Sequence, residues 1–350
     1  MSGELRPYVA KRRRIDDPAP PSPSASSDND EEASFEPGCH GSQIAAMSWE
    51  PTRGAFLVTG GSDGVVRAWE PSGRHQFYSV KHRAPVLALC FTSDGSAIVS
   101  GGYDGLIRMN DGMTGRRLQD FCLQGTAMSL RAHPQHSFLF SVGTSSKGVL
   151  LFDTRSGKKV REMPLAVRIQ DHLHLDNDAV VVASSNVERN AADRTLGVWD
   201  LESGALLSNQ PFGDERAGVT GLCAHPSGNS FAAQTLHDFI AVFNAKAPYR
   251  ELQKPKRRFA LHTTGAEKIV CDISPRQGRW IASGSAQGDG VIYDYKTGFV
   301  ATRITMRDDR LHKPWTLSIT HVLFHPLDTG RVAVARKDGT IAVTAVRLPN

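Results

Sequence analysis

The sequence has few cysteines and no long apolar run. Its 350 residues include five cysteines, which are scattered and form no C-x-x-C pair. Neither a zinc ribbon nor a disulfide framework is indicated, so we predict a reduced intracellular protein. No apolar run reaches the roughly 18 residues that cross a bilayer. The N-terminus also lacks the apolar core of a secretory signal. We therefore predict neither a helical membrane protein nor a secreted one.

The motifs of common enzymes are missing as well. The sequence contains no H-E-x-x-H or G-x-x-x-x-G-K-[ST] pattern, and we interpret its one G-x-S-x-G match, GGSDG at residues 60–64, as a repeat turn. We therefore predict no catalytic residue, no metal site, no cofactor and no small-molecule substrate. His172 and His174 lie two positions apart, so a strand would place both imidazoles on one face. Whether a third ligand completes a metal site there is left open.

Charge and composition change near residue 37. Residues 1–37 hold five basic and eight acidic residues, whereas the remainder holds 36 basic and 28 acidic residues. The stretch APPSPSASSDNDEEAS is rich in Pro, Ser and acid and has no aromatic residue. We predict a disordered arm over residues 1–37 and a single folded domain over residues 38–350.

Two kinds of signal lie within this arm. Ser22 precedes a proline and Ser27 has an acid three residues further on, so both are phosphorylation candidates. A basic run is typical of a nuclear-import signal, although a solvated charge run would look the same. This run comprises Lys11, Arg12, Arg13 and Arg14. We predict a nuclear protein and leave a cytoplasmic pool open.

From about residue 43 the chain repeats a four-strand unit. The second copy reads VLALCFTSDGSAIVSGGYDGLIRMNDGMTGRRLQDF. Short runs with period-two alternation, cut every 8–12 residues by Gly, Asp or Ser, are typical of antiparallel all-β structure. A period of about 40–45 residues with four strands each indicates the blade of a β-propeller. One residue in each third strand marks the register: Trp69, Met109, Phe152, Trp199, Phe243, Tyr293 and Val343. We therefore predict an all-β, seven-bladed propeller.

Recurring turn residues support the same architecture. An Asp can accept backbone amides in the turn before each third strand, so we interpret these residues as structural. They are Asp63, Asp104, Asp193, Asp238 and Asp338. A second feature, His-Pro after the first strand, recurs at His133, His225 and His325. The same residue spread around a ring favours turn chemistry over catalysis, which needs one convergent site.

These motifs resemble the WD-repeat family over about residues 40–350. The clearest match is Trp199-Asp200, with Asp193 in the preceding turn, and Trp69 is a second aromatic marker. We expect no blade to carry the family's complete His-Ser/Thr-Asp-Trp network. The nearest approach is His82 with Asp104, where Met109 stands in place of the aromatic residue.

The segments ADRTLGVWDLESGALLSNQPF and AAQTLHDFIAVFNAKAPYR resemble a subgroup of this family. The resemblance implies a non-catalytic protein-interaction scaffold in a nuclear RNA-processing, spliceosome-related assembly. Two alternatives stay open. Phe152-Asp153-Thr154-Arg155 and Tyr293-Asp294-Tyr295-Lys296 resemble the aromatic-acid-x-basic motif of substrate receptors of cullin-type ubiquitin ligases. A propeller hydrolase would need acids, bases or metal ligands clustered at the central channel.

One connection is strongly basic, and the ring needs a closing strand. Tyr249 and Phe259 flank the basic connection, which we interpret as a phosphate-facing patch with aromatics for stacking, or as a solvated loop. Its basic residues are Arg250, Lys254, Lys256, Arg257 and Arg258. A last blade without a fourth strand would borrow one from residues 34–42 or from RPYVA near the N-terminus. The predicted partners are therefore proteins, with an RNA contact in a ribonucleoprotein as a further expectation.

Overall fold

The computed structural model describes residues 40–165, 168–175, 179–185, 196–210, 218–252, 258–265, 267–305 and 317–349. Within these ranges the chain forms strands and turns and no helix, so none of the described segments is a helix that could span a membrane. The predicted arm over residues 1–37 lies outside the described residues, as do its basic run and both serines. The arm therefore stays a prediction.

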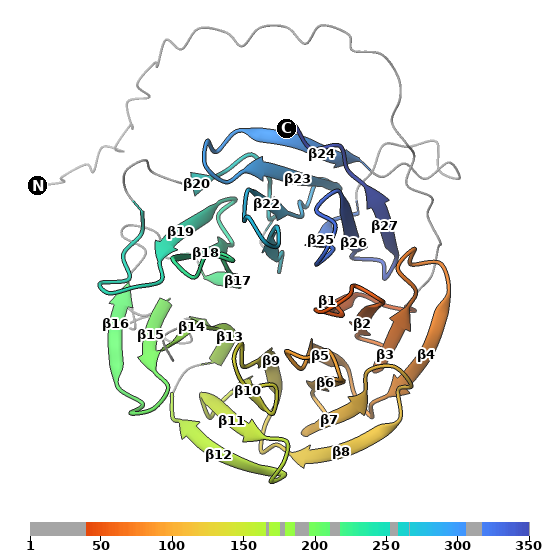
Figure 1. Ribbon diagram of the computed structural model, residues 1–350, viewed down its shortest axis with the longest axis vertical. Coiled ribbons are helices and arrows are strands. Elements are labelled where there is room, and N and C mark those ends of the chain that lie inside the picture. The colour runs from red at the N-terminus through yellow and green to blue at the C-terminus, as the bar shows by residue number, and fades with distance from the viewer. Residues whose placement is uncertain are drawn as a thin grey trace, which may run out of the picture. The chain divides into compact units, whose positions relative to one another are not determined.

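The strands form seven sheets that follow one another around a common axis (Figure 1). Blade 1 contains β1 (Ile44–Trp49), β2 (Leu57–Gly61), β3 (Val65–Trp69) and β4 (Gln76–Lys81). Blade 2 contains β5 (Val86–Phe91), β6 (Ala97–Gly102), β7 (Leu106–Asp111) and β8 (Arg117–Cys122). Blade 3 contains β9 (Ala127–Ala132), β10 (Leu139–Thr144), β11 (Val149–Asp153) and β12 (Lys158–Met163).

The second half of the ring repeats this plan. Blade 4 contains β13 (Arg168–His174), β14 (Ala179–Ser185), β15 (Leu196–Asp200) and β16 (Leu206–Gln210). Blade 5 contains β17 (Val219–Ala224), β18 (Ser230–Thr235), β19 (Ile240–Asn244) and β20 (Arg258–Phe259). Blade 6 contains β21 (Cys271–Ile273), β22 (Trp280–Ser283), β23 (Asp289–Asp294) and β24 (Val300–Thr305). Blade 7 contains β25 (Ile319–Phe324), β26 (Arg331–Arg336) and β27 (Ile341–Ala345).

Each blade is an antiparallel meander in which strand order follows chain order. The first strand of every blade lies innermost, because residues of β1, β5, β9, β13, β17, β21 and β25 line one central channel. Six blades have four strands, and the seventh has three within the described residues. The predicted all-β, seven-bladed propeller is confirmed.

Burial falls from the inner strands to the outer ones. All six residues of β6 (AIVSGG) are buried, whereas β12 (KKVREM) buries only Met163. A strand between two neighbouring strands and two neighbouring blades reads as a continuous run of small and apolar residues. A fourth strand faces solvent on one side and therefore carries charged residues. The channel side of the molecule is thus held rigidly, and the rim is open to solvent.

Aromatic side chains join neighbouring blades. Phe121 of blade 2 packs edge-on against Phe140 and Phe152 of blade 3, with ring centroids 5.2 and 5.4 Å apart. Phe140 and Phe152 stack on each other at 5.4 Å. All three rings are buried, and each such burial stabilises the fold by about 1.5–3 kcal/mol. Contacts of this kind make the sequence marker in the third strand an inter-blade residue.

The three His-Pro positions build identical turns. Nδ1 of His133, His225 and His325 accepts the amide two residues further on, at 3.2, 3.1 and 3.3 Å. On the opposite side of the imidazole, Nε2 of His225 and of His325 lies 3.2 Å from a glycine carbonyl of the next blade. The interpretation of these histidines as turn chemistry is confirmed.

A bulge fixes the register of the third strand. Pairing of β3 with β4 shifts between Ala68 and Trp69, and pairing of β7 with β8 shifts between Met109 and Asn110. Asn110 therefore occupies the position of Trp69, and the predicted marker at Met109 is wrong by one residue. The buried Asn110 amide donates to the carbonyl of Gly115 at 2.9 Å, which satisfies a polar group that an apolar pattern does not reveal.

The marker in the last blade is also displaced. Trp69 pairs with Leu57, and the residue that pairs in the corresponding way in blade 7 is Thr344, opposite Val332. The predicted marker Val343 is therefore wrong by one position. Thr344 is half-buried at a blade that has no fourth strand among the described residues. A short polar residue suffices where less surface covers it.

The first and last blades meet at a seam. The amide of His40 donates to the carbonyl of Gly339 at 3.1 Å, as the amide of His82 donates to Gly64 at the next junction. His82 directly follows the fourth strand of blade 1, so His40 occupies the position that follows a fourth strand of blade 7. Of the two predicted closing strands, RPYVA and residues 34–39 of the segment 34–42 lie outside the described residues, and residues 40–42 form no strand.

Candidate interaction surfaces

The first blade carries a complete hydrogen-bonded network. Trp69 Nε1 donates to Thr59 Oγ1 at 2.8 Å, and Thr59 Oγ1 lies 2.8 Å from His40 Nε2. His40 Nδ1 lies 3.1 Å from Asp63 Oδ1, which also accepts the amide of Val65. The expectation that no blade contains the full His-Ser/Thr-Asp-Trp network is wrong. Its histidine precedes the first strand by four residues, so a repeat counted from residue 43 misses it.

The second blade keeps three members of the network. His82 Nδ1 lies 2.9 Å from Asp104, and its Nε2 lies 2.9 Å from Ser100 Oγ. Burial lowers the pKa of His82, although Asp104 opposes that shift. Asn110 holds the place of the tryptophan and bonds elsewhere. The predicted pairing of His82 with Asp104 is confirmed, but blade 1 and not blade 2 comes nearest to the full network, and the fourth residue in blade 2 is Asn110 instead of Met109.

The described Asp residues of the repeat turns make two kinds of contact. Asp63, Asp104 and Asp338 each accept the amide two residues further along, at 3.1, 3.2 and 3.1 Å. Asp238 has a φ of 61° and accepts from the amide and hydroxyl of Thr264 at 2.5 and 2.8 Å, which joins two blades.

In blade 4, Trp199 is half-buried and Asp200 accepts the amide of Ser203 at 2.6 Å. The predicted partner of this pair, Asp193, lies outside the described residues. In the described part of blade 4, Asp200 therefore stabilises the hairpin turn that follows the third strand.

The basic connection between blades 5 and 6 is only partly described. Arg250 is exposed. Arg258 is bound to Glu251 at 2.8 and 3.2 Å and lies 4.6 Å from the centre of the Phe239 ring. Lys254, Lys256 and Arg257 lie outside the described residues.

The aromatics that flank this connection do not face solvent. Tyr249 is 5% exposed and Phe259 is 1% exposed. The predicted role of these two rings in stacking on bases is therefore wrong, because both belong to the cores of blades 4 to 6. An aromatic residue beside a basic run is more often the first core residue of the next strand. Any contact with phosphates would rest on the charges alone.

The paired histidines of β13 are structural in their contacts. Nδ1 of His172 lies 2.6 Å from Ser129 Oγ, and its Nε2 lies 2.6 Å from Ser141 Oγ. His174 Nε2 shares Ser141 at 2.6 Å, so both imidazoles lie on one face, as predicted. Burial lowers the pKa of His172 to about 3. In the described part of the chain, no three His, Cys, Asp or Glu side chains are grouped to hold a metal ion.

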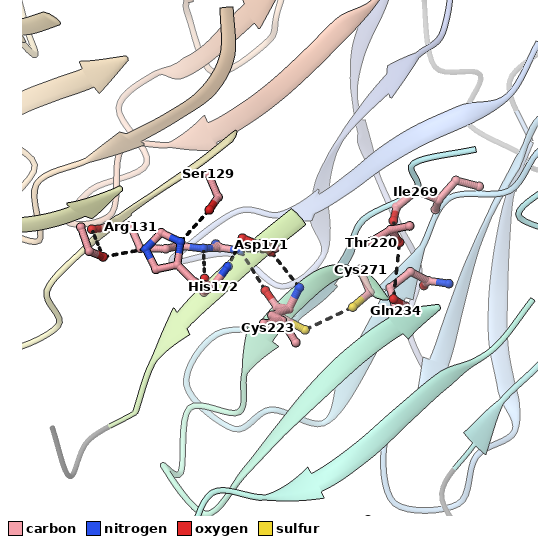
Figure 2. Close-up of polar contacts among 11 residues, drawn as sticks. Ser129, Arg131, Asp171, His172, Thr220, Cys223, Gln234, Ile269 and Cys271 are labelled. Carbon is pink, nitrogen blue, oxygen red and sulfur yellow. Dashed lines mark hydrogen bonds and ion pairs between the residues drawn. The ribbon is translucent and has the colours of Figure 1, made fainter. Parts of the chain in front are cut away.

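A charged network at the channel was missed by the sequence reasoning (Figure 2). Arg131 of β9 binds Asp171 of β13 at 2.5 Å and the carbonyl of Leu222 of β17 at 3.0 Å. Asp171 in turn accepts the amide of Leu222 at 2.8 Å and that of His172 at 2.9 Å. Three consecutive blades are thereby joined through one ion pair. The available signal was a charge in the middle of an otherwise apolar first strand.

Further polar groups line the same channel. Asp272 of β21 accepts the amide of Phe324 of β25 at 2.8 Å, and burial raises its pKa to about 6. Cys223 and Cys271 place their sulfur atoms 3.4 Å apart as free thiols. These carboxylates and thiols are engaged with strands of the neighbouring blades. The polar side chains at the channel thus form contacts that connect neighbouring blades.

The receptor-like motif in blade 3 is closed on itself. Arg155 Nη2 lies 2.9 Å from Asp153, and the guanidinium lies 3.5 Å from the centre of the Phe138 ring. In blade 6, Lys296 donates its amide to Asp294 at 3.0 Å. Both motifs therefore make the hairpin turn of their own blade. A partner would have to displace Asp153 in order to use the charge of Arg155.

Comparison with known proteins defines the class. Residues 75–111 match the family model described as "WD domain, G-beta repeat". This range runs from the fourth strand of blade 1 through the third strand of blade 2. Together with the seven-bladed fold and the His40 network, this match shows a seven-bladed β-propeller that contains a WD repeat.

The chain is similar over more than half of its length to three known proteins. It is 29% identical to "WD repeat-containing protein 25" of Mus musculus over 74% of this chain and 49% of that protein. It is 26% identical to "Pre-mRNA-processing factor 17" of Saccharomyces cerevisiae over 87% of this chain and 64% of that protein. It is 27% identical to "U3 small nucleolar RNA-associated protein 15 homolog" of Xenopus tropicalis over 55% of this chain and 36% of that protein. The chain thus spans less than two thirds of each relative.

Proposed function

We propose that this chain is a non-catalytic scaffold in a nuclear RNA-processing assembly. The observation that carries the proposal is the similarity to yeast pre-mRNA-processing factor 17 across 87% of this chain. The similarity to a U3 small nucleolar RNA-associated protein supports RNA processing as the broader class. Association with the spliceosome is the finer form of the proposal, and it rests on the name of the first of these relatives.

The geometry suits a scaffold. Rigid blades lose little conformational freedom on binding, and their exposed turns supply specificity. Among the described residues, Asp171 and Asp272 at the channel accept backbone amides of neighbouring blades. A hydrolase would need an acid, a base and an open reacting position converging at one point. The described channel residues form hydrogen bonds between strands instead.

Affinity purification of the full chain from nuclear extract tests the proposal. We expect mass spectrometry to recover RNA-processing proteins, and spliceosomal proteins would support the finer form. Recovery of ribosome-assembly factors would support the broader class and contradict the spliceosomal form. Recovery of ligase adaptors, lost on Arg155→Ala, would contradict the scaffold in favour of the ubiquitin-ligase receptor. A purely cytosolic set would contradict both the nuclear location and the role in RNA processing.

We further propose that the basic connection of residues 250–257 contacts RNA phosphates. Arg250 is exposed, whereas Arg258 is engaged by Glu251, so the proposal leaves Arg258 out. Reversing Arg250 and Arg257 to Glu should weaken single-stranded RNA binding across sequences and lower the salt slope by about two. Filter binding between low and physiological salt measures both quantities.

The control for this experiment reverses two other exposed arginines, Arg53 and Arg116, which changes the net charge equally. Equal weakening by both double variants would mean that only the net charge matters, and the assigned contact would then be wrong. The nuclear-import role of Lys11 to Arg14 and the phosphorylation of Ser22 and Ser27 stay predictions of the same model. Phosphate at either serine would offset the basic run electrostatically.

A further inference from the structure

A cavity of about 340 Å³ lies between blades 6 and 7, away from the channel. Its walls come from the turn between β21 and β22, from the turn between β25 and β26, and from the residues after β27. Arg276 and Arg279 lie on one wall of the cavity, and Leu327 lies on the other. Trp280, Leu348 and Pro349 also line the cavity.

Arg276 holds an unusual backbone conformation at this cavity. Its φ is 65°, in the left-handed region that residues other than glycine and asparagine rarely adopt. The nearest glycine in this turn is Gly278, so the left-handed conformation at position 276 falls on an arginine. Strained residues persist where the surroundings determine them, and they gather at ligand-binding positions. The side chain is exposed and makes no ion pair within the described residues.

Arg279 provides a second cation on the same wall. Its guanidinium lies 4.5 Å from the centre of the Trp280 ring and 3.8 Å from Asp294 Oδ2. The other oxygen of Asp294 accepts two amides and the hydroxyl of Thr297 within its own hairpin. The Arg279 side chain is 42% exposed, so the indole holds its plane while much of its charge remains accessible.

The opposite wall is apolar. Leu327 is 45% exposed, although most large apolar side chains of this chain are buried. Leu348 is half-buried and packs against the core cluster that contains Trp280, and Pro349 is exposed beside it. The cavity therefore combines two exposed guanidinium groups with an aliphatic wall.

We propose that this cavity binds an acidic peptide segment of a partner protein, with one apolar side chain inserted between carboxylates. Arg276 and Arg279 would bind the carboxylates, because guanidinium groups match carboxylates in two-point hydrogen bonding. Leu327 and Leu348 would contact the apolar anchor. This inference rests on the proposed scaffold function and assigns one of its binding sites.

The same features argue against a nucleic acid as the occupant. A polyanion needs a track of cations that follows its backbone. Here Asp294 and Asp328 flank the cavity, at 3.8 Å from Arg279 and Arg331 respectively, and would repel a continuous row of phosphates. A peptide with spaced carboxylates and an apolar centre avoids that repulsion.

Fluorescence anisotropy with the full chain tests the site. The probe is a fluorescein-labelled peptide in which one Phe is flanked on each side by one Asp, with Gly and Ser at the remaining positions. We expect saturable binding that weakens at least about tenfold when the Phe is replaced by Ser or the Asp residues by Lys. Absence of saturable binding, or equal affinity for the Ser peptide, would overturn the proposal.

Two variants locate the binding. Arg276→Glu and Leu327→Glu change exposed side chains and should each weaken binding about tenfold or more. Arg276→Gly relieves the backbone strain, so we expect an unchanged or higher melting temperature together with weaker binding. Arg116→Glu, an exposed arginine in blade 2, is the matched control and should change affinity less than about twofold. Equal effects of Arg276→Glu and Arg116→Glu would contradict the assignment.

The outcome separates this inference from the proposed function. If the Arg276→Glu chain recovers the same nuclear proteins as the unaltered chain and the peptide does not bind, the site is wrong and the scaffold stands. If the unaltered chain recovers no RNA-processing proteins but binds the peptide, the scaffold role is wrong and the site stands. Tighter binding of a single-stranded RNA, abolished by Arg276→Glu, would overturn the peptide in favour of a nucleic acid.

Discussion

The hydroxyl of Thr59 is shared by two buried side chains. It accepts the indole N–H of Trp69 and lies within hydrogen-bond distance of His40 Nε2, both at 2.8 Å. Burial lowers the pKa of His40, so the imidazole stays neutral and one of its nitrogens can accept the hydroxyl proton. The other nitrogen faces Asp63. Arg67 Nη1 lies 2.5 Å from that nitrogen, His40 Nδ1, and also binds Asp63 at 2.7 Å.

We predict that Thr59→Val destabilises the protein by about 1–3 kcal/mol, because the valine keeps the shape but leaves the indole N–H and the imidazole without a partner. Urea unfolding followed by tryptophan fluorescence measures the free energy of unfolding. Thr344→Val alters the third strand of blade 7 at a half-buried site and should change the free energy of unfolding by less than about 0.5 kcal/mol. A neutral Thr59→Val variant would show that the network contributes no stability.

His172 links folding to proton uptake. Its surroundings are Ser129, Ser141, His174 and the guanidinium of Arg131, and both burial and that cation keep its pKa near 3. In the unfolded chain its pKa returns to about 6.5. Between these two values the unfolded state binds more protons, so stability falls as pH decreases below about 6.5.

We predict that His172→Gln reduces the loss of stability between pH 7 and pH 5, because glutamine can bond the two serines and cannot be protonated. Urea unfolding of both proteins at the two pH values gives the difference. Asp272, whose pKa is raised to about 6, loses stability in the opposite direction as pH rises, but it is common to both proteins and cancels. An identical pH dependence of the two proteins would contradict the assignment to His172.

The inner strands bind one another through side chains as well as through packing. β9, β13 and β17 belong to three blades, and the Arg131–Asp171 pair connects all of them through the backbone of Leu222 (Figure 2). The Arg131 side chain remains 33% exposed because it faces the channel. The pair is therefore weaker than a fully dehydrated one, but each partner holds several bonds.

We predict that Asp171→Asn destabilises the protein by about 2 kcal/mol, since it leaves Arg131 without its counter-charge. Denaturant unfolding measures the change. Arg131→Met combined with Asp171→Leu should recover part of the loss, because no unpaired charge then remains at the channel. Asp328→Asn, at an exposed turn, serves as the control and should stay within about 0.5 kcal/mol of the unaltered chain. Additive losses in the double variant would contradict a direct pair.

Much of the propeller could be predicted from the sequence because each blade repeats a local pattern of strands and turns. Seven copies of period-two runs, with a turn Asp in five of them and a His-Pro turn in three, can be recognised without knowledge of distant contacts. Asn110 was missed because an apolar pattern favours Met109, although blades 1 and 2 share the same bulge at this position. His40 was missed because its network begins ahead of the first strand.

The binding surfaces were harder to predict for a different reason. The partner of Arg131 is 40 residues away in another blade, and its pairing depends on how the ring closes. Tyr249 and Phe259 read as aromatics beside a basic run, but the tertiary structure buries both. The wall that unites Arg276 with Leu327 comes from two turns of different blades. Only the assembled ring brings such residues together.

The seam between His40 and Gly339 has a consequence for how the ring is made. Each blade can form from neighbouring segments of chain, whereas this junction closes a loop of about 300 residues at an entropic cost of about 5 kcal/mol plus a constant. The packing of Ile44 and Trp49 against Ala333 and Ile341 offsets that cost only once both ends are in place. We therefore expect assembly to finish at this junction, and a nascent chain to carry an unsealed edge until its last blade has emerged.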